Sequence, residues 1–170
     1  WAMSNSSAVF LTAQQDMDVE DPGFKDLYAY GVVAEVKQVL RVSDELVKVL
    51  VEGKSRAKLL TLDSSGRFLL ASTKAAALRG TKSVDSARVE ALVRSVKEAF
   101  EEYLSLNPRL SKDVVYTIIT NEDAALLCDY IPANLLLKYT DKQALLNEGT
   151  VSGRLEKLLE ILPQYRARPM

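Results

Sequence analysis

Residues 26–59 read DLYAYGVVAEVKQVLRVSDELVKVLVEGKSRAKL, and this stretch decides the fold of the first half of the chain. It contains three Val-rich segments with the composition of β-strands. A polar break at Ser43–Glu45 separates the first two segments, and a G-x-x-R turn at Gly53–Arg56 separates the last two. The sequence therefore predicts a β-meander.

Apolar and polar residues alternate within each of these segments. One face of the predicted meander carries Val32, Ala34, Val36, Leu40 and Val42 from the first segment, interrupted by Gln38, then Val47, Val49 and Val51, then Ala57 and Leu59. Successive side chains of a strand point to opposite faces, so each strand is expected to bury one face and wet the other. Gly53 is expected to allow a tight reversal, and Arg56 either to bond the turn carbonyls or to stay in water.

Two shorter apolar runs flank the meander. Ala8–Ala13 has the composition of a buried strand, and Phe68–Ala71 follows a turn at Ser64–Gly66 and is expected to be a fourth meander strand. Between the first run and the meander, Gln14–Gly23 is rich in acidic residues and ends in Pro-Gly, which is typical of a loop.

The acidic loop raises the question of a calcium site. Its carboxylates stand at Asp16, Asp18, Glu20 and Asp21. An EF-hand loop requires Gly at its sixth position and a bidentate Glu at its twelfth, and those positions hold Asp21 and Leu27. The pattern therefore favours a solvated loop over a metal site.

Beyond residue 80 the hydrophobic period changes from two to about 3.6. Apolar residues from Val89 to Leu104 predict one long helix, capped by Ser83, Asp85 or Ser86 and ended by Asn107-Pro108. Shorter helices are predicted at Lys112–Ile119 after a Ser111 cap, at Asp123–Tyr130 before Pro132, from a Thr140–Gln143 capping box to Asn147 with Gly149 as its C′ residue, and over Leu155–Leu162 before Pro163. We expect a β lobe over residues 1–79 and a helical lobe over residues 80–170, truncated at its C-terminal end.

Composition excludes several function classes. The 170 residues carry a net charge of −1, so the chain lacks the positive field that binding to a phosphate backbone needs. No apolar run is long enough for a membrane span, and there is no secretory leader pattern. The single cysteine, Cys128, excludes an internal disulfide framework and suggests a reducing, cytoplasmic setting.

Catalytic signatures are absent from the sequence. There is no histidine, which excludes Ser-His-Asp triads and His-metal sites, and neither G-x-x-x-x-G-K-[ST] nor G-x-G-x-x-G occurs. Cys128 stands in an apolar helix, where a small buried hydrophobe is favoured over a nucleophile. We therefore expect no enzyme activity, no catalytic residue, no cofactor and no metal in this chain.

The motifs together resemble the N-terminal domain of the ATP-dependent Lon proteases. The resemblance rests on the meander and the F-L-T-A-Q-Q-D and D-P-G that precede it, and on D-K-Q-A-L-L-N-E at Asp141–Glu148 and R-L-E-K-L-L-E-I-L at Arg154–Leu162. It implies an α+β fold, in which a PUA-like β pseudo-barrel is followed by an α-helical bundle. The P-loop ATPase and the Ser-Lys peptidase of that family are missing here, so ATP and Mg²⁺ would belong to the parent protein.

The resemblance also implies a role. The domain is expected to recruit unfolded or damaged proteins for quality control by proteolysis and to support homo-oligomer assembly, as a hexamer in the parent protein. The apolar loop residues Met17, Val19 and Phe24, with Tyr28 and Tyr30 behind them, are the expected contacts because they lack an evident core face. Family members begin with another strand and a helix. We therefore also expect an exposed β edge, through which the chain self-associates, or a β lobe that is looser than the helical lobe.

Two other functions stay open at this stage. One is a stand-alone adaptor or ligand-binding protein of the same domain type, which differs in whether the gene continues into a P-loop. The other is a nucleic-acid-binding module, since PUA-like barrels include RNA binders, although the balanced charge argues against it.

Overall fold

The computed structural model describes residues 8–43, 46–80 and 86–165. The chain divides into two compact units, Trp1–Ala77 and Leu78–Met170. We call them the β unit and the helical unit and describe each by itself. The predicted caps Ser83 and Asp85, two residues of the polar break and the C-terminal tail lie outside the described residues.

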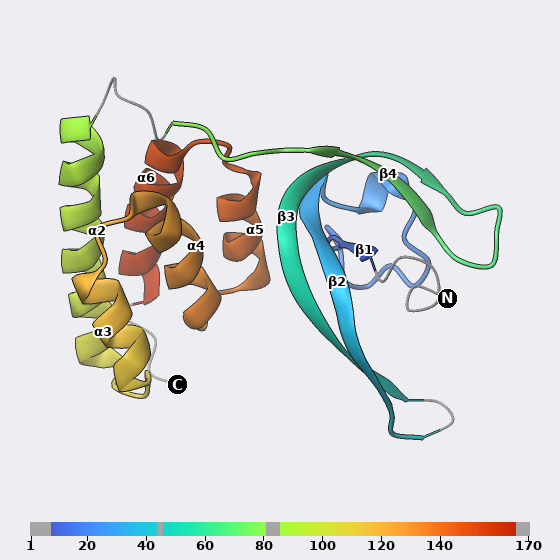
Figure 1. Ribbon diagram of the computed structural model, residues 1–170, viewed down its shortest axis with the longest axis horizontal. Coiled ribbons are helices and arrows are strands. Elements are labelled where there is room, and N and C mark those ends of the chain that lie inside the picture. Colours follow the sequence, from blue (N-terminus) through green and yellow to red (C-terminus); the bar gives the residue numbers. More distant parts are fainter. Residues whose placement is uncertain (1–7, 44–45, 81–85, 166–170) are drawn as a thin grey trace. The chain divides into compact units, whose positions relative to one another are not determined.

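The β unit is built on a four-stranded antiparallel sheet in the order β1-β2-β3-β4. Its strands are β1 (Ala8–Leu11), β2 (Tyr30–Arg41), β3 (Val47–Asp63) and β4 (Leu70–Ala75). Neighbours in sequence are neighbours in the sheet, which confirms the predicted meander. Figure 1 shows β2 and β3 as long curved ribbons, with β1 and the acidic loop inside the curve.

The predicted turn at Gly53–Arg56 is wrong. This segment is part of β3 and stays paired with β2. Gly53 pairs with Ala34, and Ser55 pairs with Val33. Lys54 is therefore the extra residue of a β-bulge, which kinks the strand without reversing it. A Cβ on Gly53 would lie 3.3 Å from Cγ1 of Val32, so glycine fits this close approach.

The expectation that every strand buries one face holds only for the inner halves of β2 and β3. The buried hydrophobic side chains of the described β unit are Ala34, Val36, Ala57 and Leu59. Beyond Val36 in β2 and before Arg56 in β3 the side chains are exposed on both faces, because nothing in the described unit covers them. The fourth strand also begins two residues later than predicted, at Leu70.

Within the described residues the helical unit contains five α-helices. These are α2 (Ser86–Leu106), α3 (Lys112–Thr120), α4 (Ala124–Asn134), α5 (Tyr139–Asn147) and α6 (Val151–Ile161), followed by the 3₁₀ turn η2 (Leu162–Tyr165). Phe100, Ile118, Leu127 and Leu155 belong to one continuous buried core that all five helices share. A sheet followed by helices is the α+β class that the sequence predicts.

Some helix ends lie where the sequence predicts them, and others do not. Ser111 caps α3 as predicted, and its hydroxyl accepts a hydrogen bond from the amide of Val114 at 3.3 Å. Pro132 does not stop α4, which continues to Asn134. Because proline has no backbone N–H, α4 continues past Pro132 without the backbone hydrogen bond that another residue would donate there.

The predicted capping box of α5 is wrong as well. The N-cap is Lys138, and its amide donates a hydrogen bond to the Tyr165 hydroxyl at 2.8 Å, while that hydroxyl donates to the carboxylate of Asp141. A tyrosine from η2 thus accepts a hydrogen bond from the N-cap amide, which is the role that the Gln143 side chain has in the predicted capping box. Gly149 does not adopt the left-handed conformation of a C′ glycine either, because the chain leaves α5 in an extended conformation at Glu148.

Within the described ranges, no helix combines the length and apolar character that crossing a bilayer requires.

Candidate protein-contact surface

The acidic loop between β1 and β2 is held at its base by backbone hydrogen bonds. The amide of Gln15 donates to the carbonyl of Asp26 at 2.7 Å, and the amide of Tyr28 donates to the carbonyl of Ala13 at 2.9 Å. The Thr12 hydroxyl adds a bond of 2.8 Å to the carbonyl of Tyr28. These bonds close the loop across its neck, so its tip is presented on an ordered base.

Within the loop, a 3₁₀ turn orients Phe24. This turn, η1 (Phe24–Asp26), begins after Gly23. The Asp26 amide donates to the Gly23 carbonyl at 3.0 Å, and the Gly23 amide donates to the Asp26 carboxylate at 2.9 Å. The two residues bind each other reciprocally across the turn. Phe24, the first residue of the turn, keeps 48% of its surface exposed.

Phe24 lines a groove in the β unit. The loop contributes Asp21, Pro22, Gly23 and Phe24, and the end of β3 with the turn that follows contributes Leu62, Ser64 and Leu69. The groove has a volume of about 470 Å³. Most of its side chains are apolar, and the Asp21 carboxylate stands among them. A concave, apolar site with few polar groups is the type of surface that binds ligands or peptides.

The five contact residues predicted from sequence differ in their exposure to solvent. Met17 is 67% exposed and Phe24 is the member that lines the groove, whereas Val19, Tyr28 and Tyr30 are half-buried. The side-chain amide of Gln14 donates to the Val19 carbonyl at 2.9 Å, so this part of the loop folds back on itself.

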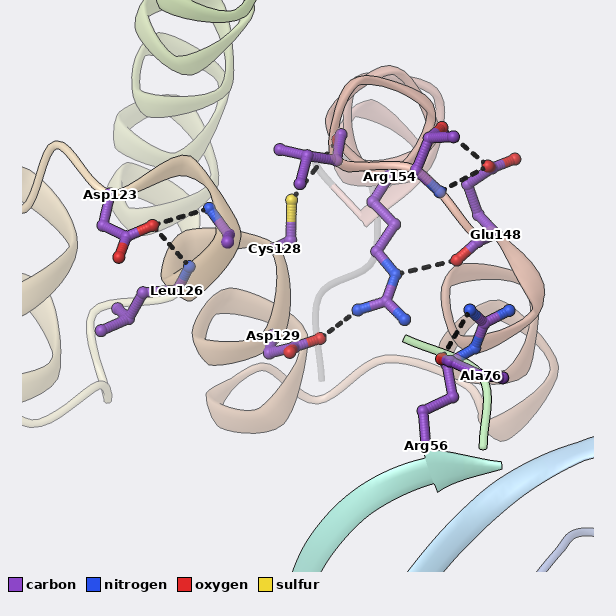
Figure 2. Close-up of polar contacts among 11 residues, drawn as sticks. Arg56, Ala76, Asp123, Leu126, Cys128, Asp129, Glu148 and Arg154 are labelled. Atoms are coloured by element: carbon purple, nitrogen blue, oxygen red, sulfur yellow. Dashed lines mark hydrogen bonds and ion pairs between the residues drawn. The ribbon is translucent and has the colours of Figure 1, made fainter. Parts of the chain in front are cut away.

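Tyr30 has a structural partner in the sheet. The guanidinium carbon of Arg56 lies 4.3 Å from the centre of the Tyr30 ring, and the Lys58 ammonium lies 6.0 Å from it. Arg56 also donates from Nη1 to the Ala76 carbonyl at 3.4 Å (Figure 2). The two alternatives expected for Arg56, a bond to the turn carbonyls or a place in water, are therefore replaced by a cation–π contact and a hydrogen bond to the segment after β4.

Sequence reasoning missed exposed apolar side chains at two places in the β unit. Those at the outer ends of β2 and β3 and between these strands are Val39, Leu40, Val42, Leu46, Val47, Val49, Leu50 and Val51. Those just before β4 and at its start are Phe68, Leu69 and Leu70. The alternation of these segments is that of half-buried strands, which is why they were expected in a core. The length of the meander could have indicated this exposure, because strands this long extend past a small core.

Acidic side chains give the loop a negative surface. Asp16, Asp18, Glu20 and Asp21 are exposed, and the Asp16 carboxylate accepts a hydrogen bond from the amide of Asp18 at 3.0 Å. Among the described residues, no three or more carboxylates, cysteines or histidines gather in a way that would hold a metal ion.

A buried polar cluster in the helical unit is centred on Arg154. Its side chain is 4% exposed, it pairs with the carboxylate of Asp129, and its Nε donates to the Glu148 carbonyl at 3.0 Å. Figure 2 shows Arg154 reaching from α6 to both partners. The cluster joins α4, α6 and the segment after α5, which is a structural role.

Cys128 is buried beside this cluster. Its thiol donates to the Val151 carbonyl at 3.6 Å (Figure 2), and burial raises the pKa of the thiol to about 12. A thiol with so high a pKa is almost fully protonated at neutral pH, which makes it a poor nucleophile. The interpretation of Cys128 as a small core residue fits its placement.

Known proteins resemble this chain in sequence, and a solved structure resembles it in fold. A sequence profile for the "ATP-dependent protease La (LON) substrate-binding domain" matches residues 2–164. The Lon protease of Escherichia coli K12 is 36% identical over 161 residues, and Lon protease 3 of Sorangium cellulosum is 38% identical over 162 residues. These matches cover 95% of this chain and 20% and 19% of the two relatives, so the chain spans about a fifth of their length.

A solved structure supports the same assignment at the level of fold. The N-terminal domain of the Mycobacterium avium complex Lon protease superposes with a TM-score of 0.65 at 18% identity, over 93% of this chain and 91% of that one. Because the family profile spans nearly the whole chain, this protein belongs to the Lon substrate-binding domain family.

Proposed function

We propose that this chain is the non-catalytic segment of an ATP-dependent protease that recruits unfolded or damaged proteins. The observation that carries the proposal is that two apolar side chains, Met17 and Phe24, are exposed on a loop that backbone hydrogen bonds close at its base. Unfolded chains differ from folded ones in the apolar side chains they expose, and an apolar surface on an ordered support binds those side chains at low entropic cost.

A binding assay with paired forms of one protein tests the proposal. The immobilised chain is offered a reduced, carboxymethylated protein that stays unfolded, and the same protein in its native form. We expect retention of the unfolded form alone. Equal retention of both forms, or of neither, contradicts the proposal.

Substitutions locate the contact. Met17→Ala and Phe24→Ala remove the most exposed of the predicted side chains and are expected to weaken retention, and Val19→Ala, Tyr28→Ala and Tyr30→Ala extend the series. Leu136→Ala is the matched control, because Leu136 is 71% exposed but belongs to the helical unit. If Leu136→Ala weakens retention as much as Phe24→Ala does, the β unit is not the contact surface.

Self-association through a β edge belongs to the same proposal. Among the described strands, β1 pairs with β2 alone, so one side of Ala8–Leu11 has no strand partner within the described residues. Unpaired strand edges recruit further strands. Sedimentation of the chain over a range of concentrations is expected to show association, together with protection of β1 amides from hydrogen exchange as the concentration rises. A strict monomer with unchanged exchange contradicts this part.

The remaining features concern the parent protein that we propose. It would be a cytoplasmic, hexameric Ser-Lys endopeptidase that uses ATP and Mg²⁺ in segments other than this one, and this segment would need no cofactor. A gene that continues past Met170 into a P-loop supports that parent protein, and a gene that ends there favours the stand-alone adaptor instead.

A further inference from the structure

The groove lined by Phe24 and Leu69 has walls from two distant parts of the chain. Phe24 is 48% exposed and Leu69 is 56% exposed, and Leu62 lies with them in the same groove. A volume of about 470 Å³ is enough for one large apolar side chain or two smaller ones. The groove therefore fits a short extended segment that inserts an apolar anchor.

Charges around the groove have mostly one sign. Asp21 lines it, and the same loop carries the other three exposed carboxylates of the acidic loop.

Few cations oppose these carboxylates. The two segments that form the groove contribute Lys25, in η1, and Arg67, in the turn before β4. The chain as a whole has a net charge of −1, so the excess of carboxylates in these two segments is a local property of the chain. A concave apolar site with carboxylates on its rim attracts cationic groups and repels anionic ones.

We propose that this groove selects unfolded segments in which an apolar or aromatic residue is flanked by lysine or arginine. The apolar anchor would contact Phe24 and Leu69, and the flanking cations would lie near Asp21 and the other loop carboxylates. This inference rests on the proposed function and adds to it a substrate class. It predicts that two unfolded segments of equal hydrophobicity bind differently when their flanking charges differ.

Three labelled peptides test the selection. They share one central apolar segment and differ in flanks of lysine, serine or glutamate, and their affinities for the whole chain are measured by fluorescence anisotropy. We expect the lysine-flanked peptide to bind about five- to tenfold more tightly than the glutamate-flanked one at low salt, because a few exposed ion pairs each contribute modestly. The difference should shrink at high salt because exposed charges are screened.

Variants separate charge from apolar contact. Glu20→Gln/Asp21→Asn is expected to remove most of the difference between lysine and glutamate flanks while the serine-flanked peptide binds unchanged. Phe24→Ser is expected to weaken all three peptides. The matched control is Glu98→Gln/Glu101→Gln, two exposed carboxylates on α2 of the helical unit, and it should leave every affinity unchanged.

The outcomes distinguish this inference from the proposed function. If all three peptides bind equally and Phe24→Ser weakens them, the charge selection is wrong and recruitment of unfolded chains survives. If the glutamate-flanked peptide binds most tightly, the charge selection is also wrong. If no peptide binds, both proposals fail. A loss of selectivity in the α2 control would place the selecting charges outside the groove and overturn the inference.

Discussion

Glu35 of β2 and Glu52 of β3 lie directly opposite each other across the antiparallel pair. Two like charges in this position repel, yet each carboxylate contacts the same two lysines, with nitrogen to oxygen distances between 2.7 and 3.1 Å. Those lysines, Lys37 and Lys54, are the extra residues of the two bulges in this pair. The bulges thus supply the cations that neutralise the opposed glutamates. We call Glu35, Glu52, Lys37 and Lys54 the quartet.

Replacing both lysines of the quartet should lower the melting temperature and should make added salt stabilising. In Lys37→Met/Lys54→Met the opposed glutamates repel without compensation, so we expect a lower melting temperature than in the natural chain. Added salt should raise the melting temperature of this variant because it screens the repulsion. Lys48→Met, at an exposed β3 position that pairs with the uncharged Leu40, is the control and should show neither change. A double variant as stable as the control would contradict a role for the quartet.

The quartet also predicts a dependence of stability on pH. Lysine contacts lower the pKa of Glu52 to about 2, below the ordinary glutamate value of 4.5. A carboxyl with a depressed pKa in the folded state stabilises the fold above its unfolded pKa and loses that contribution as it is protonated. The loss should therefore occur as pH falls from about 4.5 to about 2. The effect is small because the groups are exposed to solvent.

Thermal unfolding of the natural chain and of Glu52→Gln checks this window. The two curves of melting temperature against pH should converge as the pH falls through this range. Parallel curves would mean that Glu52 does not contribute, and an NMR titration of its carboxylate gives the pKa directly.

Gly31 is expected to tolerate no side chain. A Cβ at this position would lie 2.2 Å from the carbonyl oxygen of Leu11 and 2.7 Å from Cζ of Phe10. Gly31→Ala must therefore displace β1, and we expect a loss of about 1–3 kcal/mol in the free energy of unfolding, as for other overpacked sites. Gly66→Ala is the matched control, since its nearest heavy atom would be 3.8 Å away. Urea unfolding that shows equal stability for both variants would refute the close approach.

Asp129 is expected to stabilise the helical unit through Arg154. The arginine is buried while Asp129 is 71% exposed, so Asp129→Ala leaves a buried cation without its counter-charge. We expect a cost of about 1–3 kcal/mol in urea unfolding. Adding Arg154→Met removes the buried charge itself, so the double variant should be more stable than the sum of the two single effects predicts. Strict additivity would show that the two side chains are not coupled.

Local patterns predicted much of the helical unit. The 3.6-residue spacing from Val89 to Leu104 became α2, and the Ser111 signal became the cap of α3. The helix and the cap each depend on residues that are close in sequence, and a sequence pattern contains that information. The start of α5 could not be predicted in this way, because Tyr165 reaches its cap from the far end of the unit.

The contact surface was only partly predictable for the same reason. Phe24 was an evident candidate, since it is an aromatic residue in an acidic loop. Its partner Leu69 was not, because the groove exists only once the turn before β4 lies beside that loop. The five predicted contact residues themselves await the binding assays.

By itself, the sequence determined the family, the order of sheet and helices, and the absence of histidine and phosphate-binding motifs, because these depend on residue types and short spacings. Tertiary structure decided that residues 53–56 continue a strand through a bulge and that the outer ends of β2 and β3 stay exposed on both faces. Burial and strand register depend on what covers a residue from distant parts of the chain, and alternation along one strand does not specify that.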